Sequence, residues 1–197
     1  MQDKWVCDFY KYKQNGYFIE VGAYDGIQTS NTYSLEKDLN WTGICIEANS
    51  DSYQKLAINR RSININKAIA SSRGYCNFNG DKISSDGIGE IVECDTLHQI
   101  LIDNNCGRDI DYLSLDIEGM EYTALESLDF LYWNIGLMTV EHNLYCTNSQ
   151  QKDKIYHLLS NSGFYRVAED VKCLDQNPLW YNKPYEDWYI NTRLYIK

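Results

Sequence analysis

Short apolar runs alternate with helix-patterned segments along most of the chain. Apolar runs typical of buried strands occupy residues 17–21, 44–46, 63–69, 110–115 and 135–140. Apolar residues with helical spacing lie between them, at 28–39, 52–59, 97–101 and 123–128. Strands that alternate with helices in this way predict an α/β fold with a mostly parallel sheet and helices on both of its faces.

The C-terminal part departs from this alternation. An amphipathic helix is predicted at 151–160, and Gly163 ends it. Two further strands, 164–168 and 188–196, are expected to form an antiparallel pair at the edge of the sheet. Residues 71–90 are rich in Gly, Ser, Asn and Asp, which predicts a loop or a hairpin with edge strands. Near a ligand site such a segment serves either as a lid or as a connector, and a connector with some contact to an adenine is expected here.

The first apolar strand ends in an acid and two glycines. Residues 17–26 read YFIEVGAYDG, in which Glu20 precedes Gly22 and Gly26. Glycines let the backbone approach a ligand closely, and the helix that follows offers free N–H groups. The spacing differs from the G-x-G-x-x-G that holds a dinucleotide pyrophosphate, and an acid at this point repels phosphate. The loop suits a cationic ligand such as S-adenosylmethionine, although a glycine loop after a strand also serves as a plain turn.

Residues at two strand ends and at one helix start are also expected to contact this ligand. The second strand ends in Glu47, where a carboxylate can accept hydrogen bonds from both ribose hydroxyls of a nucleoside. The third strand ends near Ala68, beside the expected adenine. Ser30 and Thr32 either cap the helix after the glycine loop or, with its free N–H groups, hold a ligand carboxylate.

Acidic and polar residues also end two later strands. Asp116 and Glu118 follow one of them, and Glu141 and His142 follow the next. Ligands bind at the carboxyl ends of the strands in a doubly wound sheet, so these side chains are expected to face one crevice. Glu121 is expected on the surface of a helix.

Composition and charge restrict the classes of partner and the compartment that are expected. The net charge of −10 and the pI near 4.7 argue against a nucleic-acid partner, and Arg60-Arg61 is expected to be a solvated surface pair. No apolar run approaches the roughly 20 residues of a membrane span, and the N-terminus lacks a signal-peptide core. The seven cysteines are odd in number and form no C-x-x-C, which fits a reducing compartment. A cytoplasmic protein is predicted.

Several blocks of sequence together resemble the FkbM-like S-adenosylmethionine-dependent methyltransferases. They are EVGAYDG with SNTYSLEK, then GICIEAN, DYLSLDIEGMEYTALES and VEHN, over about residues 16–143. The resemblance implies a Rossmann-like class I methyltransferase sheet of seven strands and methylation of hydroxyl oxygens, often on sugars or glycosylated natural products. It implies that Glu20, Gly22 and Asp25 line the methionine end of the cofactor, Glu47 the ribose and Asp116 the transferred methyl. Ala48 stands where the family often has a proline, which leaves the backbone path after Glu47 open.

The pattern and the resemblance together predict one methyltransferase domain over residues 1–197. Residues 1–15 form a lead-in, 16–143 the cofactor-binding and catalytic core, and 144–197 the C-terminal helix and edge strands on the acceptor side. The predicted cofactor-binding residues are Glu20, Gly22, Tyr24, Asp25, Ser30, Asn31, Glu47, Ala48, Asn49, Ala68 and Asp116.

A sugar hydroxyl is a very weak acid, so its methylation needs a base or a metal. The predicted catalytic residues are Asp116, Glu118 and His142, the last because the unperturbed pKa of histidine is close to neutral. Alternatively Asp116, Glu141 and His142, or Asn143 in place of the histidine, form an oxygen-rich set that holds Mg²⁺ or Mn²⁺. The residues alone leave both alternatives open.

The predicted acceptor is a saccharide or a glycosylated small molecule. An acidic chain suits a neutral ring, and an aromatic segment with Trp180, Tyr181, Tyr185 and Trp188 either packs internally or stacks on a sugar at a cleft rim.

Three other functions compete with this one. An NAD-dependent oxidoreductase of Rossmann type shares the fold and Glu47, but Glu20 and the glycine spacing oppose it. A non-catalytic module that only binds the cofactor keeps both acids yet needs no base. An amino-directed nucleic-acid methyltransferase needs an Asp/Asn-Pro-Pro-aromatic loop, and the only prolines are Pro178 and Pro184.

Overall fold

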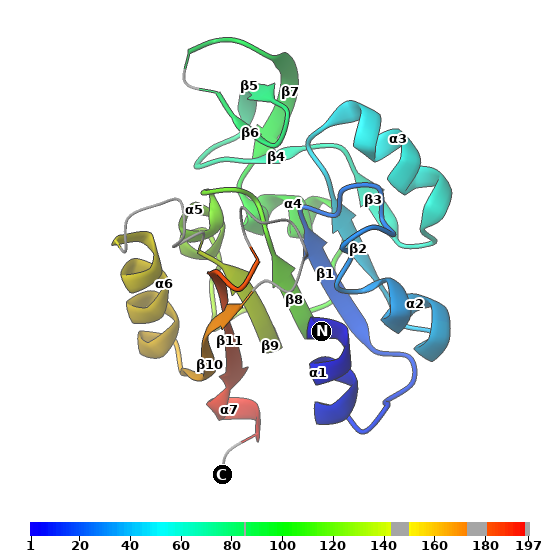
Figure 1. Cartoon of the computed structure of the whole chain (residues 1–197), viewed down its shortest axis with the longest axis vertical. Coiled ribbons are helices and arrows are strands. Elements are labelled where there is room, and N and C mark those ends of the chain that lie inside the picture. The colour runs from blue at the N-terminus through cyan, green and yellow to red at the C-terminus, as the bar shows by residue number, and fades with distance from the viewer. Residues whose placement is uncertain (85, 143–149, 173–180, 196–197) are drawn as a thin grey trace.

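The main sheet confirms the predicted α/β architecture. The computed structural model describes residues 1–84, 86–142, 150–172 and 181–195, and within these the main sheet has seven strands in the order β10-β11-β9-β8-β1-β2-β3 (Figure 1). Their bounds are Tyr17–Val21 (β1), Thr42–Ile46 (β2), Ile63–Ile65 (β3), Asp109–Leu115 (β8), Asn134–Glu141 (β9), Phe164–Lys172 (β10) and Pro184–Asn191 (β11). Neighbours from β3 to β9 are parallel. The sheet therefore has the seven strands and the mostly parallel order that the resemblance implied.

The two C-terminal strands pair antiparallel, as predicted, but their order differs from the expectation. β11 lies between β9 and β10 and is antiparallel to both, so the edge strand is β10. The burial patterns explain this order, because most side chains on β11 are buried or half-buried whereas every second side chain near the start of β10 is exposed. β11 also ends earlier than predicted, and the short helix α7 (Thr192–Tyr195) follows it.

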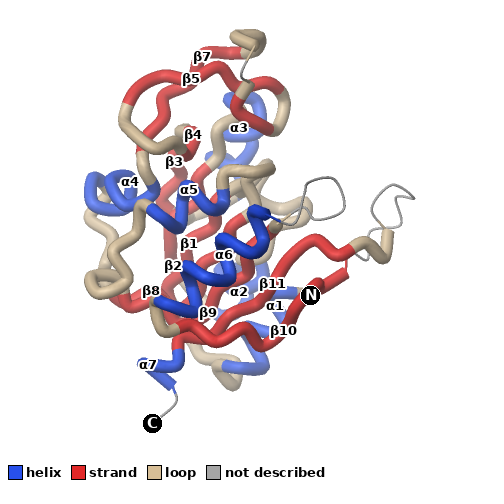
Figure 2. The backbone as a smooth tube through the Cα atoms, turned by 90° about the vertical axis from the view of Figure 1, so that its left-hand side faces the viewer, coloured by secondary structure: helices blue, strands red, loops and turns tan. Residues whose placement is uncertain are grey.

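Helices cover both faces of the main sheet, as Figure 2 shows. One face packs against α4 (Leu97–Asp103), α5 (Glu121–Glu126) and α6 (Gln150–Asn161), and the other against α1 (Gln2–Phe9), α2 (Tyr33–Leu39) and α3 (Ser50–Asn59). Each face has its own apolar core, because successive strand residues point to opposite sides. In the described ranges no helix has the length and apolar character that crossing a bilayer requires.

A smaller second sheet lies over the carboxyl ends of the main strands (Figure 1). Its order is β4 (Ala68–Ile69), β7 (Glu90–Asp95), β5 (Gly74–Asn79) and β6 (Lys82–Ile83). The strand predicted at 63–69 is therefore split between two sheets. The split occurs at Asn66, whose side-chain amide donates to the backbone carbonyls of Glu47 and Ala48, both at 2.9 Å. The connector predicted at 71–90 is a hairpin of this second sheet.

Candidate active site

A cavity of about 240 Å³ opens where the main strands end, beneath the second sheet. This is where doubly wound sheets bind their ligands. The predicted cofactor residues that line it are Gly22, Tyr24, Glu47, Ala48, Asn49, Ala68 and Asp116. Lys67, from the predicted end of the third strand, and Phe78 and Asp81, from the predicted connector, line it too. Further lining residues, which the sequence did not identify, include Thr29, Ile117 and Met120.

Glu47 is held in the wall of this cavity by two backbone N–H groups. Its Oε2 accepts from the N–H of Tyr24 at 2.8 Å and its Oε1 from the N–H of Asn49, also at 2.8 Å. Burial raises the pKa of Glu47, and the two backbone bonds limit the rise. A carboxylate has about four acceptor positions, so each oxygen can still accept one ligand hydroxyl. Glu47 can therefore bind a vicinal diol.

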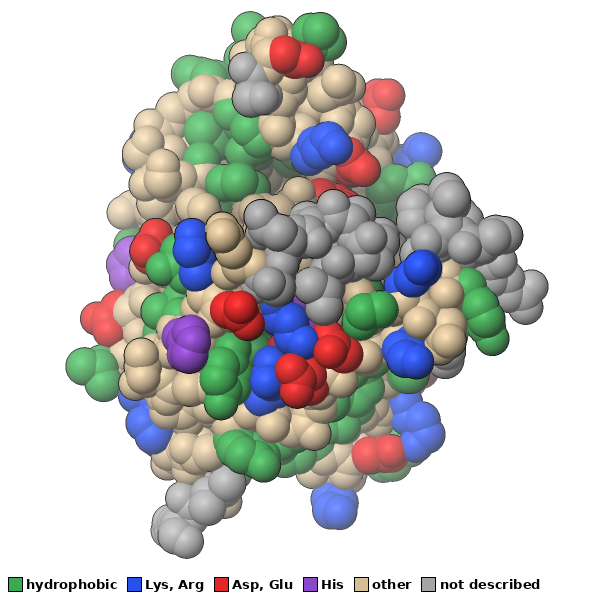
Figure 3. Space-filling view, turned by 60° about the vertical axis from the view of Figure 1, so that its left-hand side comes forward, with side chains coloured by type: hydrophobic (Ala, Val, Ile, Leu, Met, Phe, Trp, Pro, Cys, Tyr) green, Lys and Arg blue, Asp and Glu red, His purple; other side chains and the backbone are tan. Residues whose placement is uncertain are grey.

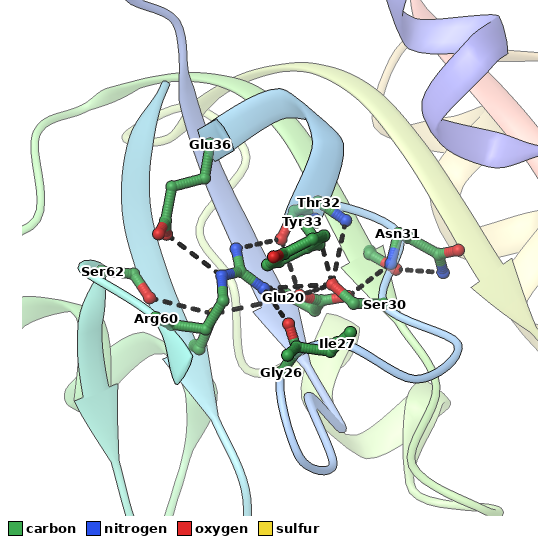
Figure 4. A network of polar contacts seen from close by, with 12 residues as sticks. Glu20, Gly26, Ile27, Ser30, Asn31, Thr32, Tyr33, Glu36, Arg60 and Ser62 are labelled. Atoms are coloured by element: carbon green, nitrogen blue, oxygen red, sulfur yellow. Dashed lines mark hydrogen bonds and ion pairs between the residues drawn. The ribbon is translucent and has the colours of Figure 1, made fainter. Parts of the chain in front are cut away.

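Glu20, predicted at the methionine end of the cofactor, does not line the cavity. Its carboxylate is buried and accepts from the Asn31 N–H (2.7 Å), the hydroxyls of Ser30 (2.9 Å) and Thr32 (2.6 Å), and the Arg60 guanidinium (3.1 Å), as Figure 4 shows. Glu20 instead fixes the loop that precedes α2. The helix predicted from residue 28 consequently begins only at Tyr33.

Asp25, Ser30 and Asn31 also make contacts within the protein and do not line the cavity. The Asn31 side-chain amide donates to the Ser114 hydroxyl on β8 at 2.9 Å. Asp25 Oδ1 accepts from the N–H groups of Ile27 and Gln28, which closes a turn. The Ser30 hydroxyl accepts from the Tyr33 N–H at 3.1 Å, which holds the turn before α2. The N-cap itself is Thr32, and its hydroxyl donates to Glu20 and does not cap the helix. The sequence signal was ambiguous because loop-forming and ligand-holding residues are of the same types.

The predicted surface position of Arg60 is wrong. Arg60 was expected on the surface with Arg61, but its side chain is buried and forms ion pairs with Glu20 and Glu36, both at 3.1 Å. It also donates to the Gly26 carbonyl and the Thr32 hydroxyl. Gly26 lies against it at φ +80°, and a Cβ there would come within 2.6 Å of Arg60 Cγ. The glycine is therefore required by protein packing.

Three carboxylates converge on the cavity from β8 and β9. Asp116, Glu118 and Glu141 have oxygens within 4.8 Å of one another. Burial and the nearby negative charge of Asp116 raise the pKa of Glu141 well above its usual range. The two strand ends therefore meet as predicted, and the buried Glu141 lies beside the charge that raises its pKa.

Glu121 supports this acidic group and is not the surface residue that was predicted. It is fully buried, and its carboxylate accepts from the N–H groups of Ile117 (3.0 Å) and Gly119 (3.1 Å). Burial raises its pKa to about 7. Glu121 thus fixes the loop that carries Asp116 and Glu118 into the cavity.

His142 does not join Asp116 and Glu141, so the predicted metal set of these three residues is wrong. Glu141 and His142 are neighbours at the end of β9, and their side chains point to opposite faces. His142 Nε2 instead lies 3.4 Å from Asp187 Oδ1 and 3.6 Å from Asp170 Oδ1. For the same reason, His142 is not placed to act together with Asp116 as a catalytic residue. Asn143 lies outside the described residues.

The carboxylates around His142 already have cationic partners. Asp187 pairs with Arg166 at 2.9 Å and Asp170 with Lys152 at 2.6 Å. Figure 3 shows charged side chains of both signs side by side on this face of the molecule. Each of the two carboxylates next to His142 therefore has a cationic partner of its own.

The aromatic residues expected at the acceptor site mostly pack on the N-terminal helix. Trp188 stacks on Trp5 with ring centroids 4.9 Å apart. The Tyr185 hydroxyl accepts from the Gln2 side chain at 2.6 Å and donates to Glu186 at 3.0 Å. Tyr181 is exposed, and Trp180 lies outside the described residues.

The stability of the protein is expected to depend on pH through the buried carboxyl group of Glu186. Glu186 is buried, and burial raises its pKa to about 7 from 4.5, so its contribution to stability is full below pH 4.5 and is lost as the pH rises to about 7. The free energy of unfolding in urea should therefore fall between pH 5 and pH 8. Both hydrogen bonds to Glu186 go to Oε1, which a glutamine retains. We expect Glu186→Gln to be more stable than the wild type at pH 8, by at most about 3 kcal/mol.

The exposed Glu126→Gln is the matched control and should leave the pH profile of stability unchanged. Glu186→Gln with a profile as steep as that of the wild type would show that the burial of Glu186 does not cause the slope.

Comparisons with known proteins agree with this architecture. A family model described as the methyltransferase FkbM domain matches residues 20–165. No curated protein sequence matches the chain. Among solved structures, a methyltransferase FkbM from Methylobacillus flagellatus KT is 13% identical with a TM-score of 0.57, and the match covers 91% of this chain and 44% of that one.

Two further solved structures resemble the chain with similar sequence identities and TM-scores. The O-methyltransferase from Bacillus cereus, solved in complex with SAH, is 12% identical with a TM-score of 0.55, over 96% of this chain and 79% of that one. Fibrillarin from Aeropyrum pernix, with natively bound S-adenosyl-L-methionine, is 13% identical with a TM-score of 0.51, over 91% and 67%. At these identities the likeness establishes the fold alone.

Proposed function

Because the chain belongs to the FkbM methyltransferase family, we propose that it transfers the methyl group of S-adenosylmethionine to a hydroxyl oxygen of a sugar. The observation that carries the proposal is the cavity at the strand ends. It presents Glu47 on one side and the carboxylates of Asp116 and Glu118 on the other, with Glu141 behind them. Glu47 suits the binding of a nucleoside, and the carboxylates of Asp116 and Glu118 suit the removal of a proton.

The residues present fit S-adenosylmethionine. Glu47 can accept from the two ribose hydroxyls, and the small side chains of Ala48 and Ala68 leave room for a base beside it. Gly22 lines the cavity at φ +86°, and a Cβ there would lie 1.7 Å from the carbonyl oxygen of Asp116. A side chain at this position would therefore disrupt the contact between the β1 and β8 strand ends that shapes the site.

Methyl transfer is an in-line displacement in which the positive charge of the sulfonium disappears as the new bond forms. The bond from sulfur to the methyl carbon breaks, the oxygen–carbon bond forms, and the hydroxyl loses its proton. Holding the cation more tightly would stabilise the ground state, so the protein contributes by aligning the acceptor and taking the proton.

Asp116 is the residue best placed to take this proton. It is exposed on the cavity, while Glu141 behind it is buried, and burial and the charge of Asp116 raise the pKa of Glu141 well above its usual range. A protonated Glu141 can donate a hydrogen bond to Asp116, which orients the Asp116 carboxylate. The hydroxyl proton then passes to Asp116 as the ether forms.

Glu47→Ala tests the cofactor part of the proposal. Removing a buried acceptor from two hydroxyls should weaken S-adenosylhomocysteine binding by about 1–3 kcal/mol, or roughly 5- to 150-fold in Kd. Isothermal titration calorimetry measures this change, and NAD should not bind the wild type. Glu126→Ala, which removes an exposed carboxylate away from the cavity, should bind as the wild type does. Tight NAD binding would instead support the oxidoreductase alternative.

A chelator tests the mechanism. The predicted metal set does not assemble, so we expect turnover to continue in excess EDTA. Asp116, Glu118 and Glu141 nevertheless form a group of oxygens of the kind that binds divalent ions. Loss of turnover in EDTA that Mg²⁺ or Mn²⁺ restores would show that these carboxylates act through a metal.

The acceptor class is tested with labelled cofactor. The protein is incubated with radiolabelled S-adenosylmethionine and a panel of saccharides, glycosylated small molecules, protein, RNA and DNA. We expect label on a saccharide hydroxyl, located by mass spectrometry. Label that appears only on protein or nucleic acid would contradict the sugar acceptor while leaving the methyltransferase assignment intact.

A further inference from the structure

The loop from Asp116 to Met120 has a backbone conformation that needs support from outside the loop. Glu118 lies at φ +51° and Gly119 at φ +112°. A positive φ is uncommon for residues other than glycine. A Cβ at Gly119 would meet nothing within 4 Å, so the backbone angle and not the surrounding space requires glycine there. The loop shapes the site, because its lining residues are Asp116, Ile117, Glu118 and Met120.

The carboxylate of Glu121 supplies this support. Glu121 is the first residue of α5 and is fully buried. Its Oε1 accepts from the N–H groups of Ile117 (3.0 Å) and Gly119 (3.1 Å), and its Oε2 accepts from the same Gly119 N–H at 3.1 Å. Backbone N–H groups that converge on one anion fix the course of the chain around it. The Glu121 side chain therefore closes the loop into a ring and sets the direction in which Asp116 and Glu118 leave the backbone.

A second group holds Glu121 from the opposite side. The helices α5 and α6 lie side by side (Figure 2), and the side-chain amide of Gln151 at the start of α6 donates to Glu121 Oε2. The next residue, Lys152, is buried and donates to Glu169 (2.9 Å) and Asp170 (2.6 Å) on β10. The start of α6 is thus attached both to Glu121 and to the edge strand of the main sheet. The position of Glu121 consequently depends on the C-terminal part of the chain.

We propose that Glu121 is a positioning residue for methyl transfer, which acts by holding the Asp116 carboxylate in place, and that Gln151 in turn holds Glu121. This inference rests on the proposed function, because it assumes that Asp116 takes the proton of the acceptor hydroxyl. Neither Glu121 nor Gln151 lines the cavity. Loss of either side chain therefore slows the chemical step and leaves cofactor binding intact, because a small displacement of a catalytic group reduces the rate strongly.

Glu121→Leu tests the first part of the proposal. It removes the acceptor of the Ile117 and Gly119 N–H groups, so kcat should fall by about 10²-fold, while the Kd of S-adenosylhomocysteine changes by less than about threefold. Glu121→Gln should lose only about 3- to 10-fold in kcat, because glutamine keeps one oxygen that can accept both bonds made by Oε1. Glu126→Leu, at an exposed position of the same helix, is the matched control and should keep the wild-type kcat.

The assays use the full chain. Single-turnover measurements with labelled S-adenosylmethionine and the member of the acceptor panel that the wild type labels give the rate of the chemical step, and calorimetry gives the affinity for S-adenosylhomocysteine. A loss of affinity as large as the loss of kcat in Glu121→Leu would show a merely structural role and overturn the proposal.

A double-mutant cycle shows whether Glu121 acts through Asp116. In Asp116→Asn the base is already lost, so adding Glu121→Leu should lower kcat by less than about threefold more. Losses that multiply in the double variant would overturn the proposal, because Glu121 would then act independently of Asp116.

Gln151→Ala tests the part played by α6, and together with Glu121→Gln it carries the test if Glu121→Leu does not fold. Gln151→Ala should lower kcat by about 5- to 10-fold, and only while Asp116 is present. Asp153→Ala, at an exposed position of the same helix, should not lower it. A wild-type kcat in Gln151→Ala overturns the role of α6, and one in Glu121→Leu overturns the role of Glu121, while methyl transfer by the wild type still supports the proposed function. A wild type that transfers no methyl group to any member of the panel overturns both.

Discussion

Replacing Arg60 with leucine is expected to destabilise the protein by about 3–5 kcal/mol, the range found when one partner of a buried ion pair is removed. The Arg60 side chain is fully buried and pairs with Glu20 and Glu36. Its loss leaves two carboxylates in a space that water does not reach, and it also removes donors to the Gly26 carbonyl and the Thr32 hydroxyl. Urea unfolding at neutral pH measures the change.

Arg61 provides the matched control in the next position. Its side chain is 69% exposed and its Nε lies 3.7 Å from Glu36, so Arg61→Leu should cost no more than about 1 kcal/mol. Adding Glu20→Gln to Arg60→Leu should recover part of the loss, because one of the stranded charges is removed. Equal, small losses at both arginines would show that Glu20 and Glu36 do not depend on Arg60 for charge compensation.

This network also has a consequence for ligand binding. Arg60 and Glu20 hold the loop from Gly26 to Thr32 (Figure 4), and Thr29 in that loop lines the cavity. A destabilised Arg60 variant should therefore lose S-adenosylhomocysteine affinity even under conditions where it remains folded.

The main sheet was predictable because parallel strands are buried on both faces and so appear as short apolar runs. The break between β3 and β4 was not predictable. It depends on the Asn66 side chain binding the carbonyls of Glu47 and Ala48, a contact between segments that are distant in the sequence. The inner position of β11 likewise depends on pairing with β9, for which a strand pattern alone gives no information.

The site was predictable where a general rule applied. Strand ends meet at one edge of the sheet, and this rule placed Glu47 and Asp116 in the wall of one cavity and Glu141 next to Asp116. The separation of Glu141 from His142 also follows from a rule, the alternation of side chains along a strand.

The role of Glu20 could not be predicted by such a rule. Its partner Arg60 is distant in the sequence, and Arg61 is the same residue type with the opposite exposure. The role of Glu121 was not predictable either. Its position at the start of a helix is typical of a surface acid, and only the structure shows the loop N–H groups that bind it.

Asp116→Asn is expected to lower kcat by about 10²- to 10⁴-fold, the usual contribution of a general base, while S-adenosylhomocysteine affinity changes by less than about threefold. An amide keeps the shape of the carboxylate but cannot take the proton of the acceptor hydroxyl. Glu141→Gln should have a much smaller effect, because burial and the charge of Asp116 raise the pKa of Glu141 and a glutamine amide can donate to Asp116 in its place. Single-turnover assays with a saturating acceptor separate the chemical step from binding.

Glu118→Gln completes this comparison. Glu118 is exposed at the cavity beside Asp116, so it is the alternative base from the same loop. With Asp116 as the base, Glu118→Gln retains most of the wild-type kcat. A large loss in Glu118→Gln with little loss in Asp116→Asn would assign the proton transfer to Glu118. A loss in Glu141→Gln as large as that in Asp116→Asn would instead show that Glu141 must ionise during turnover, which contradicts its role as the protonated partner of Asp116.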